Sequence, residues 1–317
     1  MTQKENQEAV LLRKYEKGKV TVVFRLQDLI QKEPELENIY RELALARENS
    51  DRRSEVAALL NLGDKFRSTG FLEVAVKQYD LGLSIVREIE DSLEEASILS
   101  RLGQTYTYLL QLSPAIEHHK QSLEIYRGMG DRSAEVKQLA KLGSTYALFR
   151  EHDRAINCFN EALDISREIE DRSKEGAYLS SLGGLYLDSG KVERGFKLYE
   201  QALTIFDEVG EDDPRANVHH NLGTIYLFRG DSEEAFDHYE KALTLYREIG
   251  NSYKEALILK HIGGAYFQLG QIQKAFDFTQ EAVQILKEGN HSEADSTIKQ
   301  LNYLQKKLNK KWWQFWL

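Results

Sequence analysis

Residues 138–149 read QLAKLGSTYALF, and the phrase Leu142-Gly143-x-x-Tyr146 inside this stretch returns through most of the chain. Leu-Gly recurs at 62–63, 102–103, 182–183 and 222–223, and the last copy is Ile262-Gly263. An aromatic residue follows each glycine by three positions, at Phe66, Tyr106, Tyr146, Tyr186, Tyr226 and Tyr266. Six copies at a constant spacing of forty residues make residues 51–290 one repeat array. A fixed period of this length predicts a solenoid.

Each repeat is expected to contain two helices. In the third repeat, Asp131 suits a helix N-cap, and Leu139, Leu142 and Tyr146 follow on one apolar stripe. A second helix is expected over 154–168, with its inner face formed by Ala155, Phe159, Ala162, Leu163 and Ile165. The glycine of each copy would let the neighbouring helix cross close to the backbone. The three prolines, Pro34, Pro114 and Pro214, all fall where a helix is expected to begin, a position that tolerates a missing N–H.

Several positions recur together with Leu-Gly. In the third copy they are Leu139, Leu142, Gly143, Tyr146, Ala155, Phe159 and Ala162, and in the fifth Leu222, Gly223, Tyr226, Ala235, Tyr239 and Ala242. This pattern resembles the tetratricopeptide repeat family, although the period is forty rather than the usual thirty-four residues and the closing proline is absent. The longer form is similar to the arrays of kinesin light chains, G-protein-modulator scaffolds and cyanobacterial proteins. The resemblance implies an all-α, right-handed superhelical solenoid of antiparallel helix pairs, whose first helices line a concave peptide-binding face.

The segments on either side of the six repeats are interpreted as caps. Residues 1–50 are expected to form an N-terminal helical cap in which 35–48 is the second helix of a degenerate repeat. Residues 8–32 are also expected to be helical, although 20–24 (VTVVF) is rich in β-branched residues. Residues 291–317 are expected to form a C-terminal capping helix over 293–309, followed by a Lys/Trp-rich tail.

Composition excludes several classes of protein. The chain is 41% hydrophobic and 29% charged with three prolines, which is typical of a folded protein. Its net charge of −9 disfavours general binding of nucleic acid. The single cysteine, Cys158, forms no internal disulfide. The N-terminus has no apolar core of signal-peptide length and no run of eighteen apolar residues occurs, so a cytoplasmic protein is expected.

The resemblance also places the binding face. It implies that the residues two and six before each glycine, and one and five after it, face a bound peptide. These positions follow the helical period and so share one face. With close neighbours they give the candidate peptide-binding residues Asn61, Arg67, Arg101, Gln104, Tyr108, Lys137, Lys141, Asn217, His220, Asn221, Phe228, Lys260 and His261. Asn61 and Asn221 stand where long-repeat relatives place asparagines that bond the peptide backbone.

This face carries more basic than acidic residues, although the chain as a whole has a negative net charge. The basic members Arg67, Arg101, Lys137, Lys141 and Lys260 stand against Asp64 and Asp188. A basic groove on an acidic chain predicts a protein or peptide partner that carries acidic groups. The alternative is that these are ordinary solvated positions whose charge has no bearing on a ligand.

The residue types that carry catalysis or bind metals do not form a recognisable pattern. His219 replaces a leucine found in five other repeats, and His119 replaces the aromatic of other second helices, so both are expected to point inward. No cysteine or carboxylate completes a metal-ligand set around His219, His220 and His261. Cys158 has no histidine placed beside it, and no glycine loop suits a phosphate. We therefore expect no enzyme, no metal and no cofactor.

The tail departs from the rest of the chain. All three tryptophans lie in the last six residues, WWQFWL, behind a lysine-rich helix. Its candidate anchoring residues are Lys306, Lys307, Lys310, Lys311, Trp312, Trp313, Phe315 and Trp316. Three interpretations stay open: peripheral attachment to an anionic membrane, docking on a second protein, or packing of the aromatics against the sixth repeat.

The sequence thus predicts a non-enzymatic scaffold or adaptor. One partner would bind in the repeat groove, and the tail would tether the complex to a membrane or a second protein. The alternatives are a peptide-responsive signalling regulator, and a membrane-associated assembly factor or chaperone for a larger complex. The fold alone does not choose among them.

Overall fold

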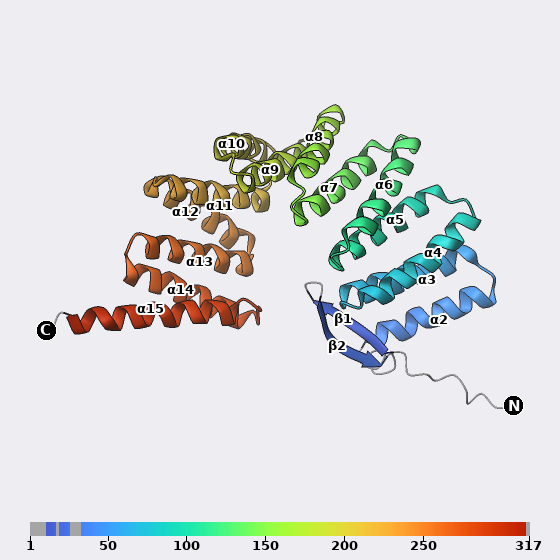
Figure 1. The fold of residues 1–317 in the computed structure, drawn as a ribbon, viewed down its shortest axis with the longest axis horizontal. Coiled ribbons are helices and arrows are strands. Elements are labelled where there is room, and N and C mark those ends of the chain that lie inside the picture. Colours follow the sequence, from blue (N-terminus) through green and yellow to red (C-terminus); the bar gives the residue numbers. More distant parts are fainter. Residues whose placement is uncertain (1–10, 17–18, 26–32, 315–317) are drawn as a thin grey trace. The chain divides into compact units, whose positions relative to one another are not determined.

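The computed structural model of the protein describes residues 11–16, 19–25 and 33–314 (Figure 1). Its elements are β1 (Leu11–Glu16), β2 (Lys19–Arg25), α2 (Pro34–Glu48), α3 (Arg52–Ser68), α4 (Leu72–Glu88), α5 (Ser92–Tyr108), α6 (Leu112–Met129), α7 (Arg132–Leu148), α8 (His152–Glu168), α9 (Arg172–Asp188), α10 (Val192–Val209), α11 (Asp212–Arg229), α12 (Ser232–Ile249), α13 (Ser252–Gln268), α14 (Ile272–Glu288) and α15 (Ala294–Gln314). The helices from α3 to α14 form six consecutive antiparallel pairs. The predicted helical repeat architecture is confirmed.

The N-terminal segment corrects one prediction. Residues 11–16 and 19–25 form an antiparallel hairpin in which Leu12 lies opposite Phe24, so the helix expected over 8–32 is wrong there. Three valines in KVTVVFR are stiff at χ1 and favour an extended strand over a helix. The rest of that expected helix, 8–10, 17–18 and 26–32, lies outside the described residues. The helix expected over 35–48 is confirmed as α2, with Pro34 in its first turn.

The ends of the helices follow local sequence signals. Asp51, Asp91, Asp131, Asp171 and Asn251 each accept a hydrogen bond from the backbone N–H three residues ahead, as N-caps of the first helices. Pro114 and Pro214 lie in the first turns of α6 and α11, as expected. Many helices end at a residue with positive φ. Gly130 (φ 69°) suits this role, whereas Arg150 (φ 62°) adopts it despite its side chain.

The repeated Leu-Gly pair holds the two helices of each repeat together. The leucine is buried, as at Leu62 (0% exposed) and Leu222 (1%). The glycine lies against a side chain sixteen residues further on, in the second helix. A Cβ added to Gly63 would come within 2.4 Å of the Tyr79 ring, and one added to Gly223 within 2.8 Å of the Tyr239 ring. The predicted close crossing of the helices at these glycines is confirmed.

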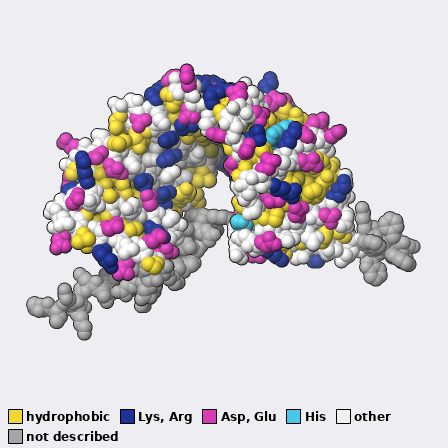
Figure 2. Space-filling view, turned by 180° about the vertical axis from the view of Figure 1, so that it is seen from behind, with side chains coloured by type: hydrophobic (Ala, Val, Ile, Leu, Met, Phe, Trp, Pro, Cys, Tyr) yellow, Lys and Arg dark blue, Asp and Glu magenta, His cyan; other side chains and the backbone are white. Residues whose placement is uncertain are grey.

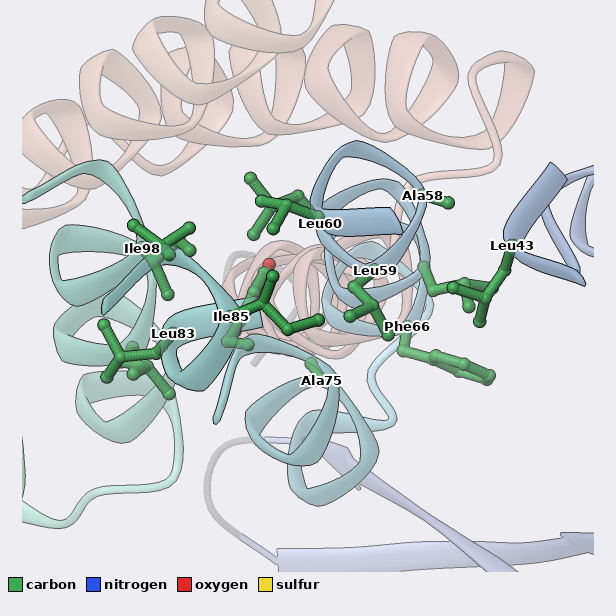
Figure 3. Close-up of a cluster of buried hydrophobic side chains, with 14 of the residues drawn as sticks. Leu43, Ala58, Leu59, Leu60, Phe66, Ala75, Leu83, Ile85 and Ile98 are labelled. Carbon is green, nitrogen blue, oxygen red and sulfur yellow. The ribbon is translucent and has the colours of Figure 1, made fainter. Parts of the chain in front are cut away.

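The chain divides into two compact units, unit 1 up to Ile169 and unit 2 from Glu170. In unit 1 a buried cluster joins α2 to α5. Figure 3 shows Leu43 of α2, Leu59 of α3, Leu83 of α4 and Ile98 of α5 within it. In unit 2 the corresponding cluster draws on α11 to α14, with Tyr239, Tyr246 and Ile258 among its members. Each pair therefore buries its apolar side against neighbouring pairs, which leaves the opposite side of the first helices available for a site.

The last helix closes unit 2. α15 packs on α14 and buries Leu304 (1% exposed). The capping helix expected over 293–309 is confirmed, and it continues to Gln314. In the part of the chain that the structure describes, no helix combines the length and the apolar character needed to cross a bilayer.

Candidate functional site

The first helices of unit 1 present three polar side chains at the same repeat position, two residues before the glycine. These are Asn61 on α3, Arg101 on α5 and Lys141 on α7. Asn61 is exposed, and the other two are partly exposed. Because the neighbouring leucine and glycine face the second helix, this position points away from the packed side. Figure 2 shows a band of lysine and arginine side chains on the lobe formed by unit 1.

Asp64 connects the basic side chains of α3 and α5. Its carboxylate accepts hydrogen bonds from Tyr79 Oη at 2.7 Å and from Arg67 Nη2 at 3.1 Å. Arg101 of α5 forms an ion pair with the other carboxylate oxygen. Burial opposes ionisation of Asp64, but the Tyr79 hydrogen bond and the charge of Arg101 outweigh it and lower the pKa of the carboxyl group. Asp64 is therefore an anion that positions two arginines.

Lys141 continues this group of charges onto α7. Its Nζ donates to the Ser100 hydroxyl at 2.8 Å. Burial lowers the pKa of Lys141, and the nearby charges of Arg101, Arg67 and Lys137 lower it further. We refer to Arg67, Arg101, Lys137 and Lys141 as the basic cluster. It carries four positive charges around the carboxylate of Asp64, so an anion placed there would relieve repulsion among the cations.

One donor of the basic cluster has no acceptor. The Nε atom of Arg101 is buried and has no hydrogen-bond partner among the described residues. Buried N–H groups are rarely left unpaired, and each such group calls for a specific explanation. The ion pair with Asp64 uses Nη1 of the same side chain. Arg101 Nε is thus a buried donor without an acceptor in this arrangement of the side chains.

Two pockets adjoin the basic cluster. The first, about 310 Å³, is lined by α3, α4 and α5, where Arg53 and Arg101 are balanced by Asp91 and Glu94. The second, about 430 Å³, is lined by Gln104, Thr107, Tyr108, His119, Ala140, Lys141, Ser144, Thr145 and Leu148. Its lining includes no acidic residue and one basic residue, Lys141. Tyr108 and Leu148, five residues after their glycines, are 53% and 56% exposed. The second pocket therefore places the apolar side chains of Tyr108 and Leu148 beside the positive charge of Lys141.

The corresponding surface of unit 2 is different in character. His220 of α11 and His261 of α13 stack with ring centroids 4.5 Å apart, and His220 Nε2 lies in hydrogen-bond contact with His261 Nδ1. Asn217 accepts from the Tyr246 hydroxyl at 2.7 Å and donates to the Asp213 carbonyl at 3.2 Å. Its amide is therefore engaged within the fold. Phe228 is the one apolar residue among the predicted binding residues of unit 2, and it is 83% exposed.

The remaining candidates of unit 2 are partly exposed: Asn221 and Lys260. Burial lowers the pKa of His220 to about 4, with a contribution from His261, and burial also lowers the pKa of His261. Among the predicted binding residues of unit 2, Lys260 is the one lysine or arginine, whereas unit 1 has four. The predicted binding residues form a coherent charged group in unit 1, and in unit 2 a stacked histidine pair and separate polar residues.

The inward histidines are where the sequence predicted them. His119 is fully buried, its Nδ1 lies 2.8 Å from Gln138 Nε2, and burial lowers its pKa to about 3. His219 is 9% exposed and pairs with His238, Nδ1 to Nδ1, at 2.9 Å. Among the described residues, no group of three or more His, Cys, Asp or Glu side chains is arranged to hold a metal ion. Burial raises the pKa of the Cys158 thiol to about 11, which disfavours the reactive thiolate.

Only part of the tail can be placed. Lys306 and Lys307 are exposed on α15, and Lys307 Nζ lies 5.5 Å from the centre of the Tyr303 ring. Lys310, Lys311, Trp312 and Trp313 belong to the last turns of α15, and their side chains are not described. Phe315 and Trp316 lie outside the described residues. The tail interpretations stay predictions.

Some residues that complete the site were not among the predicted binding residues. Leu148 stands five residues after the glycine of its repeat, as Tyr108 does, so the same spacing could have identified it. Tyr79 and Ser100 were not recognisable, because one comes from a second helix and the other precedes Arg101 on α5. The pairing of His219 with His238 joins α11 to α12 and has no short sequence signature.

A family model of the tetratricopeptide repeat matches residues 37–128, 135–208, 174–248 and 214–288. Among curated proteins, no sequence matches significantly. Several solved structures share the fold. A signal transduction ATPase with a tetratricopeptide repeat sensor from Pyrococcus horikoshii is 22% identical with a TM-score of 0.65, over 87% of this chain and 44% of that one. This chain thus spans less than half of the archaeal protein.

Two further structures are similar at low identity. A Rap protein in complex with competence and sporulation factor is 16% identical, with a TM-score of 0.56 over 84% of this chain and 80% of that one. A putative kinesin light chain with nearly identical repeats from Podosopora anserina is 17% identical, with a TM-score of 0.53 over 63% of this chain and 98% of that one. At these identities the likeness concerns the fold alone.

Proposed function

Since the chain belongs to the tetratricopeptide repeat family, we propose that it is a non-enzymatic adaptor that binds an acidic segment of a partner protein on the first helices of unit 1. Proteins of this architecture stack helix pairs into extended surfaces, and such surfaces serve in binding. The observation that carries the proposal is the basic cluster, in which Arg67, Arg101 and Lys141 come from three successive first helices. Four cations lie around the carboxylate of Asp64 there, beside the Asp91 and Glu94 of the first pocket, on a chain whose net charge is −9.

An extended peptide suits this surface better than a compact small molecule. The two pockets lie on neighbouring repeats and share the basic cluster, with Arg101 in the first and Lys141 in the second. A segment lying across α3, α5 and α7 could place one side chain in each pocket while its acidic group meets the cations. Electrostatic attraction of this kind raises the rate of association and excludes basic partners. The proposal therefore assigns specificity to charge and to the spacing of the repeats.

Site-specific cross-linking tests the proposal. A photoreactive amino acid at Ser144, exposed on α7 next to the second pocket, should capture one partner in cells. The same group at Glu124, exposed on the second helix α6, should not capture it. Capture from Ser144 should disappear when Arg101→Glu and Lys141→Glu reverse the charge of the cluster. Equal capture from both positions, or capture unaffected by charge reversal, would place the partner elsewhere.

A peptide-responsive regulator is the second candidate. The similar Rap protein was solved in complex with competence and sporulation factor, and the similar archaeal ATPase carries a tetratricopeptide repeat sensor. A regulator would change shape when it binds its ligand, whereas an adaptor need not. X-ray scattering of the protein with and without the captured partner segment distinguishes the two, because a ligand-dependent change in radius of gyration favours the regulator.

We also propose that the lysine-rich end of α15 and the tail beyond it form the tether of the adaptor. The exposed Lys306 and Lys307 support this role, since basic side chains followed by aromatic residues suit an anionic interface. A membrane-associated assembly factor would use the same tether and would co-purify with intermediates of a larger complex.

A further inference from the structure

We infer that the anionic group which the basic cluster binds is a phosphoryl group on a serine or threonine side chain, and that a large apolar residue beside it fills the second pocket. The inference rests on the proposed function, and it specifies the chemistry of the segment bound there. The first observation is the positive charge that remains after the carboxylates near the basic cluster are paired.

The charge balance favours a dianion. With Arg53 of the first pocket, the basic cluster of Arg67, Arg101, Lys137 and Lys141 provides five positive charges. Asp64 and the Asp91 and Glu94 of that pocket provide three negative charges, so two positive charges remain. A partner carboxylate would bring one further negative charge, whereas a phosphate monoester brings nearly two at neutral pH. Burial lowers the pKa of Lys141, and the nearby cations lower it further, so an anion of higher charge relieves more of the repulsion among these cations.

The available donors also fit a phosphoryl group. Asp64 occupies Nη2 of Arg67 and Nη1 of Arg101. Arg101 Nε has no acceptor, and Lys141 Nζ has donors beyond the one directed to Ser100. The exposed Lys137 lies four residues before Lys141 on the same face of α7. Donors from three side chains can thus serve the three terminal oxygens of a phosphate ester, whereas a carboxylate offers two oxygens.

The apolar requirement comes from the second pocket. Lys141 belongs both to the basic cluster and to the lining of this pocket. On the same lining, Tyr108 and Leu148 each expose about half of their side chains. A ligand that neutralises Lys141 therefore has an apolar surface immediately beside it, and burial of a Leu-sized side chain there would stabilise the complex. The first pocket, where Asp91 and Glu94 balance the arginines, offers no comparable preference.

Three fluorescent peptide libraries test the inference. Each has three degenerate positions on either side of a central residue, which is phosphoserine, glutamate or serine. Fluorescence anisotropy with the full chain should show the phosphoserine library binding at least tenfold more tightly than the glutamate library, with no measurable binding of the serine library. Sequencing of retained phosphopeptides should show Leu, Ile, Met or Phe selected at one flanking position.

Variants identify the residues responsible. Lys141→Met should remove most of the preference for phosphoserine, and Lys77→Met, on the exposed side of α4 in the same unit, should leave it unchanged. Tyr108→Ser with Leu148→Asn should abolish the apolar selection while discrimination of phosphoserine from serine persists. Circular dichroism melting checks that each variant is folded.

The outcomes separate this inference from the proposed function. Equal binding of the phosphoserine and glutamate libraries, lost in Lys141→Met, overturns the phosphoryl assignment and supports an acidic partner. Binding of the phosphoserine library that is unaffected by Lys141→Met overturns the inference as well. If no library binds up to millimolar concentration, the inference fails, and cross-linking from Ser144 still decides the proposed function independently.

Discussion

Arg127 donates from Nε to the carboxylate of Glu135 at 2.8 Å, and so joins the end of α6 to the start of α7 across the turn between two repeats. Arg132 Nη1 binds the other carboxylate oxygen at 2.8 Å. The Glu135 side chain is only 4% exposed, whereas both arginines are about two-fifths exposed. Equivalent pairs are Arg47–Glu55 at 2.8 Å and Arg247–Glu255 at 2.7 Å. The longer turn of the forty-residue repeat thus contains an ion pair between repeats.

We predict that removing both arginines destabilises unit 1 more than removing the carboxylate charge. Arg127→Met with Arg132→Met leaves Glu135 ionised and buried, at a cost of about 3 kcal/mol. Glu135→Gln leaves the half-exposed arginines in contact with water and costs about 1–2 kcal/mol. Urea denaturation followed by circular dichroism measures both. Arg41→Met, which breaks the exposed Arg41–Glu37 pair, is the control and should change stability by under about 0.5 kcal/mol. Equal losses of stability in the double arginine variant and in Glu135→Gln would contradict the prediction that the buried Glu135 carboxylate depends on the two arginines.

Adjacent glycines in α13 should respond in opposite ways to alanine. A Cβ on Gly263 would meet Thr279 Oγ1 at 2.6 Å and the Ala275 carbonyl oxygen at 3.1 Å, whereas a Cβ on Gly264 has open space within 4 Å. Gly263→Ala should therefore destabilise unit 2 by about 1–3 kcal/mol through overpacking. Gly264→Ala should stabilise it by about 0.5–1 kcal/mol, because alanine loses less backbone entropy in a helix.

Thermal melting of the two alanine variants provides the measurement, and each serves as the control of the other. A stabilising Gly263→Ala would mean that α13 and α14 separate more easily than the packing of Thr279 indicates.

Acid should weaken unit 2 through His219. Burial and the nearby His238 lower the pKa of His219 to about 4 in the folded protein, whereas the unfolded value is about 6.5. The stabilisation is therefore complete above pH 6.5 and is lost as the pH falls toward 4, because the unfolded chain takes up the proton first. At pH 5 this histidine should account for a loss of up to about 2 kcal/mol.

His219→Leu restores the residue found at this position in five other repeats and removes the proton-binding group. The variant should gain stability relative to the wild type, and the gain should be larger at pH 5 than at pH 7 in urea denaturation. A gain independent of pH would show that His219 keeps an ordinary pKa in the folded state.

The periodic features of the fold were predictable because they depend on short-range sequence. The Leu-Gly pair, the aspartate caps and the proline positions each act within one helix or one helix pair, so Gly143 and Asp131 could be assigned directly. The hairpin was missed because KVTVVFR lies outside the repeat, where no periodicity supplements local preference. Its valines favour a strand, but a helix was expected there because the repeats that follow are helical.

The candidate site was predictable only as a set of residues that share a face. Helical spacing places Arg101 and Lys141 at equivalent positions of α5 and α7. It does not reveal that Asp64, thirty-seven residues before Arg101, neutralises part of its charge, since this depends on side-chain conformations across two repeats. The same limit applies to Asn217, whose amide is engaged by Tyr246. Spacing along a helix therefore identifies candidates, and contacts between repeats decide which of them remain free for a ligand.

The tail should bind anionic membranes through its aromatic end. We predict that the full chain sediments with vesicles of phosphatidylcholine and phosphatidylserine, and that a chain ending at Lys311 stays in the supernatant. Each lysine near the surface should contribute about 1 kcal/mol before screening. Lys306→Glu with Lys307→Glu should therefore weaken sedimentation of the full chain, and added salt should do the same, whereas the contribution of the aromatic residues should persist.

Vesicles of pure phosphatidylcholine serve as the control, because they retain the apolar interface and lack the negative charge. If the full chain and the truncated chain both stay in the supernatant, the membrane tether is wrong. A pull-down with the same two chains then separates the remaining interpretations. A protein retained only by the full chain indicates a docking motif, and a truncation that retains the same proteins but melts at lower temperature indicates that the aromatic residues pack against the sixth repeat.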